Sequence, residues 1–424
     1  MRRERFECEM RPRWLPGWDG KYRWIIVIYS PEHGVRTPGK DVGVKVSCLQ
    51  ENLQRALARV SRAVATKSAL PALSNVLLAS DDGRLRIAAT NLEIGVTSWV
   101  GASVEAEGRI TVDARLLSDF VNTLPNAPLT LEVEPGKMLL QVTSGRDKAG
   151  INGLDAEDFP VIPLLGELET FSATIDPQRL REMIGQVEFA AASDDSRPVL
   201  AGVLARLEGQ SLTLATADGF RLAVRQGDLT EPVAERLEVI VPARGMRELA
   251  RLIGDHDEPL RIAITPNKSQ LLVRVGETEF LSRLVDGTFP DFQQIVPREF
   301  ATRIEMGRDA FLNAVRRASY FARDNNDVVK LQVHAGDEDV MPGTVEISAS
   351  AAERGSSQSF VDASISGPET QIAFNARYLV DVLGVVRNGQ VMIGMNGSKL
   401  AGVLRAVGDD EYTHVIMPMV IGPD

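Results

Sequence analysis

The side chains that could support catalysis are few in this chain and are poorly placed for it. The acidic pairs Asp81-Asp82, Asp194-Asp195 and Asp409-Asp410 have the composition of a two-metal nuclease site. Each pair lies in a polar, turn-like stretch next to Gly or Ser, so we interpret these residues as solvated loop acids. Asp218 and Asp286, each followed by Gly, are interpreted as turn formers.

Metal ligands and phosphate-binding loops are also missing from the sequence. It contains no HExxH, no paired CxxC and no GxxxxGK[ST] motif, and its histidines do not pair at ligand spacing. The histidines are His33, His256, His334 and His414. Two cysteines, Cys8 and Cys48, can neither organise a fold through disulfides nor hold a metal, which suits a reducing cytoplasm. We therefore expect a non-catalytic, cytoplasmic protein without a metal or cofactor.

Length and composition predict a soluble protein of several domains. With 424 residues, the chain exceeds the size at which one hydrophobic core usually stops growing. An apolar content of 44% with 25% charged residues is ordinary for a globular protein. No window of about 18 apolar residues could span a bilayer.

A whole-domain repeat is the strongest pattern in the sequence. The pairs Ala114-Arg115, Ala243-Arg244 and Ala376-Arg377 each begin a short predicted helix, at intervals of about 130 residues. The first two copies of the repeat end with similar sequence motifs, LDAEDFP (Leu154–Pro160) and VDGTFP (Val285–Pro290). Because the copies share no catalytic cluster, the repeat indicates that the protein works through the spatial arrangement of its domains and not through catalysis.

The first helix of each copy is amphipathic. Over 49–64, five apolar residues recur at helical spacing, while Arg55, Arg59 and Arg62 fall on the opposite face. The apolar residues are Leu49, Leu53, Leu57, Val60 and Val64. Asp176-Pro177 is a capping acid followed by a helix-starting proline, and Phe311 lies in the third such helix.

Alternating runs such as LRIAAT, KMLLQVTSG and QLLVRVG, separated by Gly-containing turns, predict antiparallel strands between the helices. Each copy is therefore expected to be α+β, with its helices gathered on one side.

Charge is segregated between the helices and the rest of the chain. The six predicted helices (49–67, 111–124, 176–191, 243–253, 307–323 and 375–388) contain 16 Lys and Arg against 9 Asp and Glu, in a chain whose net charge is −11. If the helices share one surface, that surface attracts a polyanion while the remainder repels it. This favours a nucleic-acid path confined to one place, although helices 111–124 and 176–191 are slightly acidic.

Four motifs in order carry a resemblance to a known family. They are TADGFRLAV (Thr216–Val224), LVDGTFPDFQQIVP (Leu284–Pro297), FNARYLVDVL (Phe374–Leu383) and VIMPM (Val415–Met419). From about Val44 to the C-terminus, the sequence resembles the bacterial DNA polymerase III sliding clamp, the β subunit of the replicative polymerase.

The resemblance implies the DNA clamp fold: three repeated domains, each with antiparallel sheets outside and two helices inside, forming half of a closed ring. The expected domains are 44–165, 170–298 and 301–424. Two chains would close head to tail around double-stranded DNA, contact it independently of sequence, and act as a processivity factor for the replicative polymerase. Residues 1–43 lie outside the repeat and are expected to be a disordered extension or a start-site artefact.

The resemblance also implies two sets of site residues. DNA contacts are expected from the helix arginines and from basic residues at family positions; these are Lys67, Arg55, Arg59, Arg197, Arg244 and Arg247. A groove between the second and third domains is expected to bind short apolar peptides of the clamp loader, the polymerase and repair proteins. Its residues would be Leu200, Ala217, Gly219, Phe220, Arg221, Leu222, Pro290, Ile295, Val415, Met417, Pro418 and Met419.

Two departures from the family pattern affect details. Ala217 replaces a frequent Thr, which makes the groove more apolar, and Pro198-Val199 replace aromatic residues found in some relatives. Two other classes of protein remain open at this stage. An enzyme would hydrolyse or transfer nucleotides alone, and a pure protein scaffold would not be retained on closed circular DNA.

Overall fold

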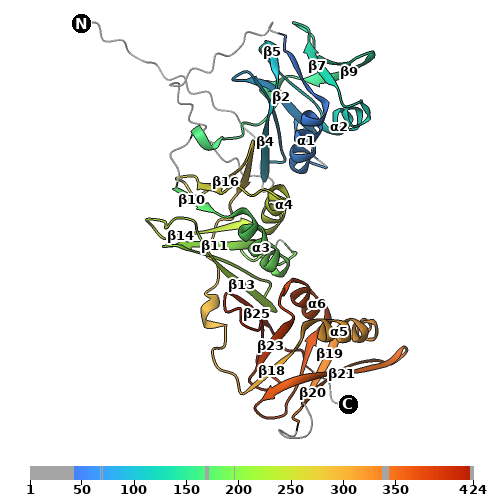
Figure 1. Cartoon of the computed structure of the whole chain (residues 1–424), viewed down its shortest axis with the longest axis vertical. Coiled ribbons are helices and arrows are strands. Elements are labelled where there is room, and N and C mark those ends of the chain that lie inside the picture. Colours follow the sequence, from blue (N-terminus) through green and yellow to red (C-terminus); the bar gives the residue numbers. More distant parts are fainter. Residues whose placement is uncertain are drawn as a thin grey trace, which may run out of the picture. The chain divides into compact units, whose positions relative to one another are not determined.

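A computed structural model describes residues 43–66, 68, 70–167, 171–194, 196–336 and 343–420 of the chain. Within these ranges, helices and antiparallel strands follow one another in three similar repeats (Figure 1). The predicted α+β class and the threefold repeat are confirmed. No helix in the described ranges is long and apolar enough to cross a membrane.

The first repeat packs its first helix much as the sequence predicted. Its strands are β1 (Lys45–Leu49), β2 (Asn75–Asp81), β3 (Arg84–Thr90), β4 (Ile94–Gly101), β5 (Ser103–Ala106), β6 (Arg109–Asp113), β7 (Pro128–Val133), β8 (Leu139–Ser144) and β9 (Asp147–Leu154), and its helices are α1 (Gln50–Val60) and α2 (Ala114–Thr123). Leu53, Leu57 and Val60 are buried. The prediction for Leu49 was wrong: it is the extended N-cap residue of α1 and is 44% exposed.

The second repeat shows the predicted capping acid. Its strands are β10 (Phe171–Ile175), β11 (Gly202–Glu208), β12 (Ser211–Ala217), β13 (Arg221–Asp228), β14 (Leu237–Pro242), β15 (Leu260–Ile264), β16 (Gln270–Val275) and β17 (Thr278–Arg283), and its helices are α3 (Pro177–Val187) and α4 (Ala243–Ile253). The Asp176 side chain accepts a hydrogen bond from the Arg179 amide at 2.7 Å, and Pro177 begins α3.

The third repeat completes the pattern of helix starts. Its strands are β18 (Thr302–Gly307), β19 (Val328–His334), β20 (Gly343–Ala351), β21 (Gly355–Ser366), β22 (Gln371–Asn375), β23 (Gln390–Met395), β24 (Gly402–Ala406) and β25 (Tyr412–Ile416), and its helices are α5 (Arg308–Ala322) and α6 (Ala376–Val385). Asn375 caps α6 by accepting from the Arg377 amide at 2.9 Å. All three Ala-Arg pairs therefore begin a helix, as predicted.

Strand pairing continues from one repeat into the next. β17 pairs with β4 antiparallel, which joins the second repeat to the first in a 13-stranded sheet. β13 pairs with β25 antiparallel, which joins the second repeat to the third in a 12-stranded sheet. Backbone hydrogen bonds therefore cross both junctions, so each junction is part of a sheet and not a free linker.

Helices of neighbouring repeats also meet across these junctions. Arg62, in the 3₁₀ turn after α1, lies 3.5 Å from Glu248 of α4, and Arg387, just after α6, lies 3.4 Å from Glu182 of α3. Within repeats, α1 packs on α2, α3 on α4 and α5 on α6; the last two pairs are seen in Figure 1. These ion pairs place the segment after α1 beside α4 and the segment after α6 beside α3.

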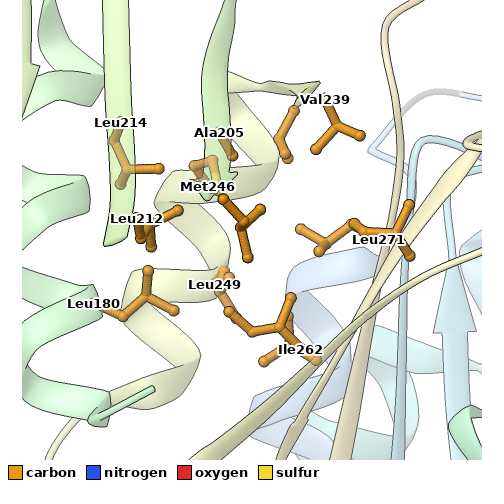
Figure 2. A pocket seen from close by; sticks show the side chains of 13 residues that line it. Leu180, Ala205, Leu212, Leu214, Val239, Met246, Leu249, Ile262 and Leu271 are labelled. Carbon is orange, nitrogen blue, oxygen red and sulfur yellow. The ribbon is translucent and has the colours of Figure 1, made fainter. Parts of the chain in front are cut away.

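The cores form from the apolar faces of these elements. One buried cluster extends through the first and second repeats, another fills the third, and a smaller one lies where the second and third repeats meet. The core of the second repeat holds an apolar cavity of about 30 Å³, lined by leucine, isoleucine and valine side chains with Ala205 and Met246 (Figure 2). Its size and apolar lining make it a packing defect, not a ligand site.

Candidate nucleic-acid interface and partner groove

Two of the predicted DNA-binding arginines lie on α1 and differ in freedom. The Arg55 side chain is 65% exposed, and among the described residues its hydrogen bonds and ion pair all go to neighbours on its own helix, Glu51 and Asn52. Arg59 donates to the Thr278 hydroxyl of the second repeat at 3.3 Å. Arg55 is therefore available to a ligand, whereas Arg59 also forms a hydrogen bond between the first two repeats.

The arginines of α4 are partly neutralised by acids. Arg247 binds Glu188 through two guanidinium nitrogens, at 2.6 and 3.0 Å, and this hydrogen-bonded carboxylate raises the arginine's pKa. Arg251 pairs with Glu248 at 2.7 Å. Arg244 lies 4.0 Å from Glu93, and both side chains are more than 60% exposed. The exposed face of α4 therefore carries both positive and negative side chains.

The remaining predicted DNA contacts lie in loops. Lys67 is outside the described residues. Arg197 is exposed, and a Cβ atom at Gly219 would lie 3.5 Å from its terminal nitrogens, so its guanidinium covers the Gly219 backbone. Among the described residues, the only hydrogen bond of the Arg197 side chain is a 3.5 Å contact to the Asp218 carbonyl. Arg197 thus stands beside the predicted partner groove.

Arg221 is the hub of that groove. Asp218 shapes the turn by accepting from the Phe220 and Arg221 amides, and its carboxylate binds the Arg221 side chain at 3.0 Å. The same guanidinium binds Asp381 of α6 at 2.7 Å and the Phe189 carbonyl at 2.7 Å. Arg221, only 9% exposed, therefore connects the second and third repeats at the centre of the predicted site.

The predicted groove residues separate into a buried floor and an exposed rim. Leu200, Leu222 and Val415 are buried in the small junction cluster. Phe220 is 62% exposed, Ile295 48% and Met417 44%. The Met417 amide donates to the Phe220 carbonyl at 2.8 Å, which joins the two sides of the rim. Pro290 is also exposed, and Ala217, Pro418 and Met419 are half-buried.

The sequence analysis missed several residues of this site. Tyr378 lies under the Arg221 guanidinium, 4.3 Å from carbon to ring centroid, and burial raises the pKa of its hydroxyl. The Phe189 ring also contacts this guanidinium, with 5.4 Å from its central carbon to the ring centroid. Tyr378 and Asp381 belong to the FNARYLVDVL motif, which was the available signal for them.

Two residues of the acidic pairs, Asp81 and Asp409, are bound by other side chains. Asp81 accepts from the Trp99 indole at 2.7 Å, and Asp409 binds the buried Arg225 at 2.6 Å. The prediction that these acids are simply solvated was wrong for Asp81 and Asp409. Asp195 is outside the described residues. In the part of the chain that the structure describes, no cluster of His, Cys, Asp and Glu could hold a metal ion.

Comparisons with known proteins agree with this geometry. Three sequence models of the DNA polymerase III β subunit match in order: the N-terminal domain at 44–163, the central domain at 174–291 and the C-terminal domain at 293–420. The beta sliding clamp of a Synechocystis species is 30% identical over 395 residues, which cover 89% of this chain and 99% of that protein. The chain belongs to the DNA polymerase III β subunit family, the beta sliding clamps.

Solved structures of the family have the same fold. The sliding clamp from Bacillus subtilis matches with a TM-score of 0.83 at 28% identity, over 89% of this chain and 99% of that one. A Pseudomonas aeruginosa clamp bound to griselimycin matches with a TM-score of 0.82 at 31% identity, over 89% and 100%. The chain is thus a DNA sliding clamp of replication, a non-catalytic processivity factor that acts on DNA with a polymerase, and the enzyme alternative falls away.

Proposed function

We propose that two copies of this chain close head to tail into a ring around double-stranded DNA, in the cytoplasm, and hold it without reading its sequence. The proposal is supported by the ion pairs Arg62–Glu248 and Arg387–Glu182, which hold helix pairs of neighbouring repeats beside one another, and by the strand pairing that crosses both junctions. The three domains are taken as 44–165, 170–298 and 301–424, with residues 1–43 as an N-terminal extension of the repeated sequence.

The proposed DNA contacts are Lys67, Arg55, Arg59, Arg197, Arg244 and Arg247. Three of these arginines already lie within ion-pair distance of a carboxylate, so each adds little to the affinity for phosphate; the pairs are Arg55–Glu51, Arg244–Glu93 and Arg247–Glu188. Weak contacts suit a sliding protein, because a closed ring prevents escape by topology and needs no tight grip. The tethered polymerase then remains at high effective concentration near the primer end.

The proposed partner site is the groove around Arg221, which would take short apolar peptides of the clamp loader, the polymerase and repair proteins. Its buried floor offers leucine and valine, while its rim offers Phe220, Ile295 and Met417 at the surface. An exposed methionine beside an aromatic residue adapts to different apolar side chains. Griselimycin binding by the Pseudomonas aeruginosa clamp supports a ligand site in this family.

Mass in solution tests the ring, and substitution of Met417 tests the groove. Sedimentation should show a species of two 46.2 kDa chains, whereas a stable monomer would contradict closure. Met417→Asp should weaken binding of a dye-labelled apolar peptide about tenfold or more, because a carboxylate is placed on the apolar rim. Met138→Asp is the matched control, since Met138 is an exposed methionine in the first repeat. Equal effects of the two substitutions would place the groove elsewhere.

A further inference from the structure

A cleft of about 970 Å³ joins the proposed partner groove to the first turn of α4. Phe220 and Arg221 contribute from the groove, Arg244 and Arg247 from α4, and Arg197 from the loop between them. Residues that the sequence assigned to two different functions therefore line one space.

Three of the five arginines in this cleft already face carboxylates. Arg221 is saturated by Asp218 and Asp381, and Arg247 by Glu188. Arg244 has Glu93 at the 4.0 Å limit of an ion pair. These groups contribute little uncompensated charge to a ligand.

The other two arginines, Arg197 and Arg283, are not neutralised in this way. Among the described residues, Arg197 makes no ion pair, and its side chain donates one hydrogen bond, at 3.5 Å to the Asp218 carbonyl. Asp194 also lines the cleft, where hydrogen bonds from Ser196 and, less strongly, the Arg197 charge lower the pKa of its carboxyl, so Arg197 is only partly compensated. The Arg283 side chain, which is exposed, makes no hydrogen bond or ion pair with any residue in the described ranges. At the start of α4 the Ala243 amide already donates to the Ala201 carbonyl at 3.1 Å, while the positive end of the helix dipole lies at the cleft.

Apolar side chains stand beside these cations. Pro198, Leu284 and Val285 line the same cleft, together with the rings of Phe220 and Tyr378. A DNA backbone would use the charges and leave these groups facing water. A peptide that follows an apolar anchor with a carboxylate would use both, because burial of the apolar part and a charge-assisted hydrogen bond occur together.

We propose that the partner peptides of this clamp carry carboxylates directly beside their apolar anchor, and that Arg197 and Arg283 bind them. This inference rests on the proposed partner groove and names the chemistry of its ligands. The acidic flank decides which apolar tails bind best, since the unpaired arginines favour carboxylate over neutral or cationic flanks.

Binding of designed peptides to the full chain tests the proposal. Three dye-labelled peptides share the core Leu-Ala-Leu-Leu-Phe and carry Glu-Glu, Gln-Gln or Lys-Lys on both sides. In low salt, the Glu peptide should bind about fivefold more tightly than the Gln peptide, the Lys peptide should bind most weakly, and 1 M NaCl should reduce the differences.

Substitutions then identify the arginines responsible. Arg197→Gln and Arg283→Gln should each lower the ratio of the Gln-peptide to the Glu-peptide dissociation constant. Arg146→Gln is the matched control, because Arg146 is an exposed arginine of the β8–β9 turn with no ion pair among the described residues, and it should leave the ratio unchanged.

The outcomes separate this inference from the groove itself. Equal affinity for the Glu and Gln peptides, or a ratio insensitive to both substitutions, would overturn the inference while leaving the groove intact. Failure of all three peptides to bind would remove the groove and the inference with it. If Arg197→Gln and Arg283→Gln weakened duplex DNA binding and left the peptide ratio unchanged, the cleft would be a nucleic-acid site.

Discussion

His414 should make this clamp sensitive to mild acid. It lies in β25 at the junction of the second and third repeats, is completely buried and stacks on Phe189 with 5.6 Å between ring centroids. Neither imidazole nitrogen has a hydrogen-bond partner in the described part of the chain. Burial, with a smaller effect from the nearby Arg221 charge, lowers its pKa from 6.5 to about 3.

The direction and size of the effect follow from proton linkage. Because the folded-state pKa is depressed, the unfolded chain binds a proton that the folded chain refuses between pH 6.5 and about 3. His414 therefore has little effect on stability above pH 6.5 and destabilises the fold increasingly as pH falls below it. At pH 5 the loss relative to pH 8 is about 2 kcal/mol, from 1.36 kcal/mol per pH unit over about 1.5 units.

His414→Phe isolates this contribution, since the ring can keep its stacking and no hydrogen bond is lost. Each variant is unfolded with urea at pH 8 and at pH 5, and unfolding is monitored by hydrogen exchange of the peptide that contains β25. The two titrations give the unfolding free energy of each variant at each pH. The acid-induced loss should be smaller by about 2 kcal/mol in His414→Phe than in the parent. Ile416→Val, on the same strand, is the control and should destabilise by about 1 kcal/mol at both pH values. An undiminished pH dependence in His414→Phe would refute the reasoning.

Three further substitutions test other parts of the structure. Arg225→Met should lower the free energy of unfolding by about 2 kcal/mol in urea titrations, because Arg225 is 4% exposed and binds both Asp409 and Glu411. Arg236→Met, which breaks a half-exposed ion pair, should lower it by less than about 1 kcal/mol. Equal losses in the two variants would contradict the role of burial. Ala205→Val should stabilise by about 1 kcal/mol by filling the cavity of Figure 2, and a lower melting temperature would show that the space cannot take the added methyl groups. Arg221→Lys should weaken apolar peptide binding about tenfold in fluorescence anisotropy, since an ammonium cannot reproduce the planar contacts to Asp218, Asp381 and Tyr378; unchanged affinity would argue against Arg221 as the hub.

Local features of the fold were predictable from the sequence because they depend on neighbouring residues. The Ala-Arg pairs marked the starts of α2, α4 and α6, and Asp176 marked the cap of α3, since capping and helical periodicity act within a few residues. The prediction for Leu49 was wrong because it considered only helical spacing. Leu49 fits the apolar face of α1, but pairing of β1 with β7 holds it in extended conformation.

Features that depend on long-range contact were not predictable. Pairing of β17 with β4 and of β13 with β25 joins strands far apart in the chain. The residues of one strand do not indicate which distant strand it pairs with. The environment of Arg221 was missed because Phe189 lies 32 residues earlier in the same repeat and Asp381 lies in the third repeat. Asp409 was taken for a loop acid because its partner, Arg225, lies in a strand of another repeat.

The central claim is that DNA is held by topology, not by affinity. The most direct measurement loads the protein on a nicked circular DNA with a clamp loader and ATP, and then follows retention before and after the circle is cut once. The account predicts that the protein stays on the intact circle and leaves when the DNA becomes linear. Equal retention on both forms, or no retention on the circle, would contradict it.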